Sequence, residues 1–345
     1  WWWARRRAAT RTGWASPSSA RLFIRDAVSG AVIRQIIVDD SGGNGLSEVR
    51  AADLDGNGTA DVLYAGDLKG NVWKFDISDK NNTSQWRAAA VSGNTASPLF
   101  RATDPSGNSQ PITGGVALAR EPSSGNIFVV FGTGSYMIPG DLESTQVQTI
   151  YAVIDDSAKN RVRNLDRDDL EPRMIMRSGV DELGRAARSW EPYSELESEH
   201  GWYVDLDEPT AGERVVTAPV VRGRALWFAS IIPEFGGGCE VGGTGYLNAV
   251  DVFTGTNPGR ADGSTYSFID VNRDGEGDDY LAGSNSGDEG LVTSVDVGIG
   301  MPSQPTFVGD DAYAAGSDAK LGRLPGLPVG KRPARLRWHE LVGDE

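Results

Sequence analysis

The chain has 345 residues, of which 39% are hydrophobic and 23% charged, a composition typical of a folded globular protein with a large core. Its formal net charge of −15 repels phosphate backbones, which disfavours nucleic acid as a partner, and it attracts divalent cations. The single cysteine, Cys239, excludes an internal disulfide and a zinc site made of thiolates, and the presence of only two histidines excludes most histidine-based sites.

The first stretch of the chain, residues 1–20, begins WWWARRR and has no initiator methionine and no apolar segment after its arginines. We therefore expect an unstructured segment or fragment edge instead of a signal peptide, with any export signal lying upstream. The sequence contains no run of about 18 apolar residues, so it predicts no membrane-spanning helix.

Residues 21–319 repeat one pattern, in which an apolar strand enters a glycine-containing turn and a second strand ends at an aspartate. The clearest examples are RLFIRDAVSGAVIRQI, VLYAGDLKGNVWKFDIS, IFVVFGTGSYM with QTIYAVIDD, and ALWFASIIPEF with GGTGYLNAVDVFTG. About twenty such strands, at about four per blade, predict an all-β modified β-propeller with about five blades and irregular inserts. Because an open ring leaves unpaired faces, we expect these blades to be part of a larger ring.

Two segments depart from this pattern. The polar stretch Ser157–Pro172 predicts a short helix or loop on the outside, with Ser157 as a possible N-cap. Residues 320–345 are rich in proline and basic side chains and end in RLRWHEL, so we expect an extended C-terminal strap that docks on the propeller.

The acidic run DLDGNGTAD has oxygen-bearing residues at alternate positions. Aspartates occupy positions 1, 3 and 9, asparagine position 5, glycine position 6 and threonine position 7, as in a calcium-binding loop. Oxygen ligands without sulfur or imidazole suit a hard cation, and calcium fits better than magnesium, which keeps its waters. The expected ligands are Asp53, Asp55, Asn57, the backbone carbonyl of Thr59, and Asp61.

A second run, DVNRDGEGD, has the same spacing and is also followed by a short strand. Asp, Asn and Gly are common turn formers, but three carboxylates within nine residues repel one another unless a cation neutralises them. In place of the glutamate that an EF-hand carries at position 12, the first loop has Tyr64, which predicts modest affinity. The second set of expected calcium ligands is Asp270, Asn272, Asp274, Glu276 and Asp278.

The stretch NGLSEVRAADLDGNGTADVLYAGDLKGNVWKFD closely resembles the calcium-loop region of the PilC/PilY-type adhesins of type IV pili. The resemblance continues in the same order through FVVFGTGSYM, GWYVDL, CEVGGTGYLNAVDVFTG and RWHEL, and it covers about residue 21 to the end. It places the family's calcium ligands on the five residues of the first loop. The second loop is not part of the resemblance and depends on its own spacing.

This resemblance implies a non-enzymatic, secreted domain at the pilus tip or outer membrane. Its partners would be the pilus, through minor pilins, and a host or abiotic surface. Calcium occupancy would regulate pilus extension against retraction, and with it twitching motility and surface adhesion. The resemblance does not include the family's large N-terminal adhesive region, to which the choice of bound surface would belong.

Two alternatives remain open on the residues alone. AGDLKGNVWKFD also resembles a blade of the quinone-cofactor dehydrogenases, although neither paired cysteines nor a stacking tryptophan stands out. A generic calcium-stabilised extracellular propeller with no pilus role would carry the same acidic hairpin.

A serine-hydrolase site is disfavoured because GTGSYM, around Ser135, lacks the nucleophile-elbow pattern. Cys239 is either buried or paired with a cysteine outside this sequence.

Overall fold

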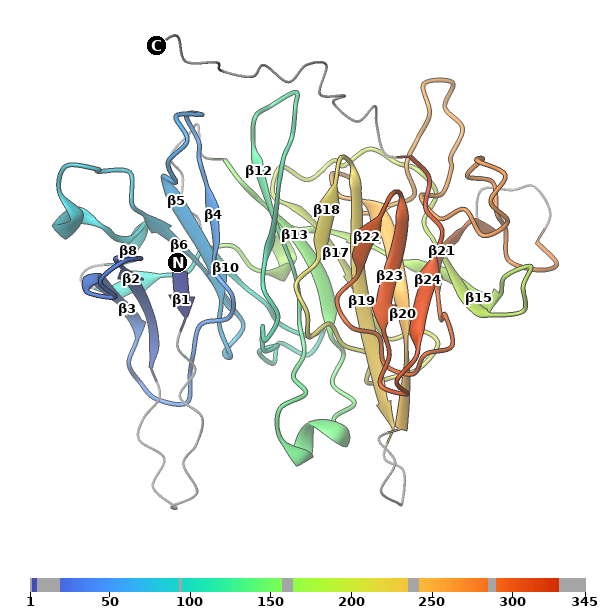
Figure 1. Ribbon diagram of the computed structural model, residues 1–345, viewed down its shortest axis with the longest axis horizontal. Coiled ribbons are helices and arrows are strands. Elements are labelled where there is room, and N and C mark those ends of the chain that lie inside the picture. The colour runs from blue at the N-terminus through green and yellow to red at the C-terminus, as the bar shows by residue number, and fades with distance from the viewer. Residues whose placement is uncertain are drawn as a thin grey trace, which may run out of the picture.

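The computed structural model describes residues 2–4, 19–92, 95–156, 164–234, 242–284 and 290–328, and its regular structure is almost entirely β (Figure 1). The first strands are β1 (Trp2–Ala4), β2 (Ala20–Arg25), β3 (Val32–Asp39), β4 (Arg50–Ala52), β5 (Val62–Gly66), β6 (Asn71–Asp76), β7 (Arg87–Ala88), β8 (Ala90–Ser92), β9 (Thr95–Ser97) and β10 (Phe100–Arg101). The middle strands are β11 (Ala117–Arg120), β12 (Ile127–Gly132), β13 (Thr149–Asp155), β14 (Glu171–Arg173), β15 (Ile175–Val180), β16 (Ala186–Trp190) and β17 (Gly201–Asp205). The last strands are β18 (Val220–Arg222), β19 (Ala225–Glu234), β20 (Gly242–Asp251), β21 (Val292–Val295), β22 (Thr306–Val308), β23 (Asp311–Ala315) and β24 (Leu321–Leu324).

Within the described ranges, helical structure is limited to short 3-10 turns: η1 (Thr83–Gln85), η2 (Pro139–Leu142) and η4 (Arg167–Asp169). The last of these falls in the polar stretch for which we expected a short helix or loop. It is capped by Asp166, whose carboxylate accepts the amide hydrogen of Asp168. Ser157, the N-cap expected from the sequence, lies outside the described residues.

The strands form five sheets of three to six strands and one small two-stranded sheet, β8–β9. Their orders are β1-β2-β3, then β10-β6-β5-β4 with β7 beside β6, then β11-β12-β13-β17-β14, then β15-β16-β21-β20-β19-β18, and finally β22-β23-β24. The blue N-terminal sheet lies at one end of the long axis and the red C-terminal strands lie toward the other end (Figure 1). The all-β fold predicted from the sequence is confirmed.

All four repeated phrases form antiparallel hairpins: β2 with β3, β5 with β6, β12 with β13, and β19 with β20. In each hairpin, several consecutive residues of the two strands pair with one another, such as Val130 with Ala152 in the third hairpin. The alternation of side chains along these strands then decides which residues face each neighbouring sheet.

Both faces of the central strands are buried. On β5, Leu63 and Ala65 pack toward the first sheet, while Val62 and Tyr64 pack toward the third. The same division occurs on β12 and β19, whose successive residues belong to different hydrophobic clusters. A strand covered on both faces needs a continuous apolar run, which is why VLYAG and IFVVFG show no polar alternation.

Four hydrophobic clusters result, one between each pair of consecutive large sheets. The edge strands β4, β11 and β18 pair with β5, β12 and β19, and β11 lies beside both β4 and β18. Sheets that pack face to face and bring one edge strand to a common centre are the arrangement of propeller blades.

A buried ion pair fixes the largest sheet internally. The Arg188 guanidinium on β16 is fully buried and donates to both oxygens of buried Glu213, at 2.6 and 2.9 Å. It also donates to the Asn248 side chain on β20 at 3.0 Å and to the Glu208 carbonyl at 2.7 Å, and it lies 3.9 Å from the ring centroid of Tyr246. Because a buried charge is costly without a partner, these contacts hold β16, β20 and the β17–β18 connection in one arrangement.

The third and fourth large sheets are interleaved along the chain. The third sheet contains β14 and β17, but β15 and β16, which lie between them in sequence, belong to the fourth sheet. The chain therefore passes from one sheet to the next and returns before either is complete.

The two flanking segments are partly described. Within residues 1–20, Trp2–Ala4 forms β1 and pairs with β2, where we expected no regular structure. Within residues 320–345, Leu321–Leu324 forms β24 and is already part of the fifth sheet. Cys239 and the terminal RWHEL lie outside the described residues, and the division into three segments stays a prediction.

We predict that Phe131→Ala destabilises the protein by about 3–5 kcal/mol, because a large ring is removed from between two sheets. Phe131 is fully buried, and the centroid of its ring lies 5.3 Å from that of Tyr151 and 5.8 Å from that of Phe100. Urea unfolding followed by tryptophan fluorescence measures the change. The control is Val28→Ala, at a side chain that is 97% exposed, which should change the unfolding free energy by no more than about 0.5 kcal/mol.

Candidate metal centre

The first acidic loop connects β4 to β5 and is folded by its own side chains. Asp53 accepts the amide hydrogens of Gly56 at 2.8 Å and Gly58 at 2.7 Å. From the other end of the loop, Asp61 accepts the amide hydrogen of Leu54 at 2.8 Å. Both glycines have positive φ, 77° and 85°, so the chain can turn tightly around the carboxylates.

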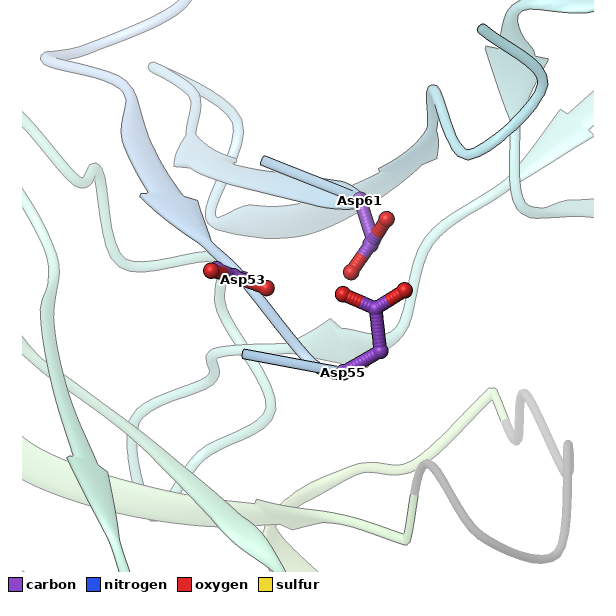
Figure 2. A group of neighbouring side chains, drawn as sticks. All are labelled: Asp53, Asp55 and Asp61. Carbon is purple, nitrogen blue, oxygen red and sulfur yellow. The ribbon is translucent and has the colours of Figure 1, made fainter. Parts of the chain in front are cut away.

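This turn brings three carboxylates together. Asp53, Asp55 and Asp61 each offer one oxygen, and the three oxygens all lie within 4.8 Å of one another. The Asp55 and Asp61 carboxylates face each other, with Asp53 beside them (Figure 2). A cluster of carboxylate oxygens with this spacing matches the donor set that calcium prefers, so the residues fit a hard divalent cation.

The other two expected ligands, Asn57 and Thr59, lie in the same loop. The Asn57 side chain donates to Asp55 at 2.7 Å, and its oxygen accepts the amide hydrogen of Thr59 at 2.9 Å. The structure thus groups the three carboxylates as one set and connects Asn57 to it by hydrogen bonds. Their role as ligands stays a prediction.

The hydrogen bonds of the loop favour the charged form of Asp53. The Gly58 amide, followed by other donors of the loop, lowers the pKa of Asp53 below its usual value. Ionised carboxylates at close range repel one another, so a cation bound between them would be stabilising.

The side chain of Lys80 already places a positive charge beside this cluster of carboxylates. The Lys80 ammonium lies 3.2 Å from Asp61 Oδ1 and also donates to the backbone carbonyls of Ala60 and Ile77. Its side chain is 38% exposed, so solvent screens the pair and its contribution is small. The sequence pattern did not indicate this lysine, because it comes nineteen residues after Asp61 in sequence.

The second acidic loop differs from the first in one respect that the spacing did not predict. Asp270 is buried, but Asp278, the expected position-9 ligand, is exposed and the next residue, Asp279, is buried. Among the residues that the structure describes, no second group of three acidic, histidine or cysteine side chains converges as closely as the first.

Ser135 has a structural role in its turn. Its hydroxyl donates to Asp141 at 2.7 Å, and the same carboxylate oxygen accepts the amide hydrogens of Met137 at 2.7 Å and Ile138 at 3.1 Å. Asp141 therefore organises the turn that leads into η2.

The chain is similar to proteins of a known family. Residues 7–176 match the model of the PilY1 beta-propeller domain. A type IV pilus biogenesis factor PilY1 homolog of Xylella fastidiosa is 32% identical over 303 residues, which make up 84% of this chain and 20% of that protein. This chain belongs to the PilY1 β-propeller family.

Other PilY1 relatives agree with this assignment. The PilY1 protein of Pseudomonas aeruginosa is 29% identical over 287 residues, 74% of this chain and 24% of its own length. The crystal structure of the Pseudomonas aeruginosa PilY1 C-terminal domain superposes with a TM-score of 0.70 at 25% identity, over 90% of this chain and 67% of that one. The chain thus spans about a fifth to a quarter of the curated relatives' length. In the part of the chain that the structure describes, no helix is both long and apolar enough to cross a bilayer.

We predict that Asp61→Asn weakens calcium binding at the first loop by about tenfold or more, because the charge and number of oxygen ligands set affinity in such loops. Calorimetric titration of calcium into the purified chain measures the change. The matched control is Asp79→Asn, which removes the same charge from a nearby exposed turn outside the cluster. Equal affinity in the two variants would contradict the assignment.

We also predict that Lys80→Gln tightens calcium binding at this loop. Removing a cation that competes for Asp61 should gain up to about 1 kcal/mol, or about fivefold in affinity. The gain should shrink at high salt, because screening already weakens an exposed pair. Weaker binding in Lys80→Gln would instead mean that the ammonium is needed to keep the loop folded.

Proposed function

We propose that this chain is the calcium-binding propeller of a non-enzymatic protein associated with type IV pili. The observation that carries the proposal is the convergence of Asp53, Asp55 and Asp61 on a blade hairpin of a PilY1-family domain. Calcium is the cofactor, and the partners are minor pilins of the pilus and a host or abiotic surface. The protein would act outside the cell, at the pilus tip or on the outer membrane.

The mechanism starts from repulsion among the three carboxylates. A bound cation neutralises them and fixes the loop between Asp53 and Asp61, with Asn57 and the Thr59 carbonyl completing the ligand set. The loop connects β4 to β5, and β4 lies beside β11 at the centre of the blades. Calcium occupancy would therefore stiffen the inner edge of the second sheet and the surface that it presents.

In biological terms, this stiffening would couple calcium to pilus extension and retraction, and so to twitching motility and surface adhesion. Residues 21–319 would form the propeller, and residues 1–20 and 320–345 would flank it. Support for a pilus role comes from the relatives, which are named type IV pilus biogenesis factors. A calcium-stabilised propeller with no pilus role has the same local geometry, so the experiment must separate the two.

The test uses the full-length gene in its native host, with Asp53→Asn and Asp61→Asn introduced together by allelic exchange. We expect the double variant to be exported normally but to show altered surface piliation and reduced twitching when calcium is present. Asp79→Asn is the matched control and should behave as wild type.

Two results would contradict the proposal in different ways. Normal pili and twitching in a variant that has lost calcium binding in vitro would reject calcium regulation. Normal pili in a strain lacking the whole propeller would reject the pilus role and favour the generic propeller.

A further inference from the structure

The second acidic loop folds like the first, although nothing in the family resemblance implies it. Gly275 donates its amide hydrogen to Asp270 at 3.1 Å, and Glu276 donates to Asp274 at 2.8 Å. The amides at the same positions of the first loop make the same two bonds, from position 6 to position 1 and from position 7 to position 5. The two loops therefore share a hydrogen-bond pattern as well as a spacing.

The backbone conformation is also shared. Position 4 has positive φ in both loops, 77° at Gly56 and 65° at Arg273. An arginine adopts the left-handed region at a cost, so the second loop keeps this turn against the preference of its sequence.

The short strand expected after the second loop is reduced to an isolated bridge between Tyr280 and Leu291. The match with the first loop becomes complete when one extra residue is allowed before this bridge. Leu54 donates its amide hydrogen to Asp61 at 2.8 Å in the first loop, and Val271 donates to Asp279 at 2.7 Å in the second. The Asp61 carbonyl accepts the amide hydrogen of Ile77, and the Asp279 carbonyl accepts that of Val292, both at 2.9 Å. Asp279 therefore takes the place of Asp61, and Asp278 is an exposed insertion.

Two buried oxygens in this loop have no hydrogen-bond partner: Oδ1 of Asp270 and Oδ1 of Asp279. These side chains are only 7% and 5% exposed. Their other oxygens accept hydrogens from the amides of Gly275 and Val271, so both carboxylates enter the same loop, one from each end. Buried carboxylate oxygens normally have a donor or a metal ion as partner.

Neighbouring negative charges add to the cost of burying these two carboxylates without a partner. The carboxylates of Asp270 and Glu182 lie near that of Asp279, so like charges repel one another at a buried position. A divalent cation between the two carboxylates would remove both the repulsion and the unmet coordination.

We propose that the second loop is a calcium site whose buried ligands are Asp270 and Asp279, with Asn272, Asp274 and the Glu276 carbonyl closing it toward solvent. Asp278, the ligand expected from the spacing, has no part in it. This site is independent of the proposed pilus role and of the first loop.

The position of this loop gives the cation a structural effect. Asp270 donates its amide hydrogen to the Pro325 carbonyl at 3.2 Å, and Leu327 donates to the Phe268 carbonyl at 2.9 Å. The loop thus begins where the segment that follows β24 pairs with the connection between β20 and β21 of the fourth sheet. A cation held by Asp270 would fasten the end of the fifth sheet to the fourth.

The test measures calcium binding by calorimetry in the full chain with the first loop disabled by Asp53→Asn and Asp61→Asn. In this background we expect one remaining site. Adding Asp279→Asn should abolish it, whereas adding Asp278→Asn, the matched control with the same charge change, should leave affinity within about twofold. No binding at millimolar calcium in the background, or equal loss in both variants, would overturn the proposal.

Thermal unfolding keeps the result interpretable if a variant folds poorly. Asp279→Asn removes a buried repulsion, so without calcium it should melt at or above the temperature of the background chain. With calcium it should show none of the upward shift that the background and Asp278→Asn show. Hydrogen exchange should report calcium-dependent protection of the Leu327 amide, and its absence would reject the fastening role.

Discussion

The burial of both faces of each central strand is the constraint on which this structure depends. A strand such as β12 sends alternate side chains into two different cores, so each sheet is stabilised only by the sheets on its two sides. The side chains of such a strand are largely apolar, and a charged one such as Arg188 needs a buried partner. The two acidic runs lie in connections between strands, where close carboxylates repel one another and favour a bound cation.

The two acidic loops occupy equivalent places. The first precedes β5 and the second precedes Tyr280, which forms an isolated bridge with Leu291. In both, the carbonyl of the last loop aspartate is already hydrogen-bonded, so fixing the loop also fixes where this pairing begins. The loops differ in how their charge is compensated. In the first, Lys80 offsets part of the charge of Asp61, whereas the second leaves an oxygen of Asp270 and one of Asp279 buried without a donor. Their affinities for a cation should differ accordingly.

Much of this could be predicted from the sequence, because it depends on local patterns. Continuous apolar runs separated by glycine turns predicted the hairpins, and the alternation of acids predicted the first loop and the convergence of Asp53, Asp55 and Asp61. Contacts between distant segments could not be predicted in this way. Spacing cannot reveal that Lys80 returns to Asp61, or that an inserted residue moves the buried position from Asp278 to Asp279, because burial is decided by the neighbouring sheet.

The interleaving of the third and fourth sheets has a mechanical consequence. Since β15 and β16 are inserted between two strands of the third sheet, no single cut of the chain separates these blades into intact halves. The Arg188–Glu213 pair joins β16 to the connection that leads out of the third sheet, so it spans the same junction. A pulling force applied to the two ends of the chain would have to rupture both blades in one event instead of peeling them off in turn.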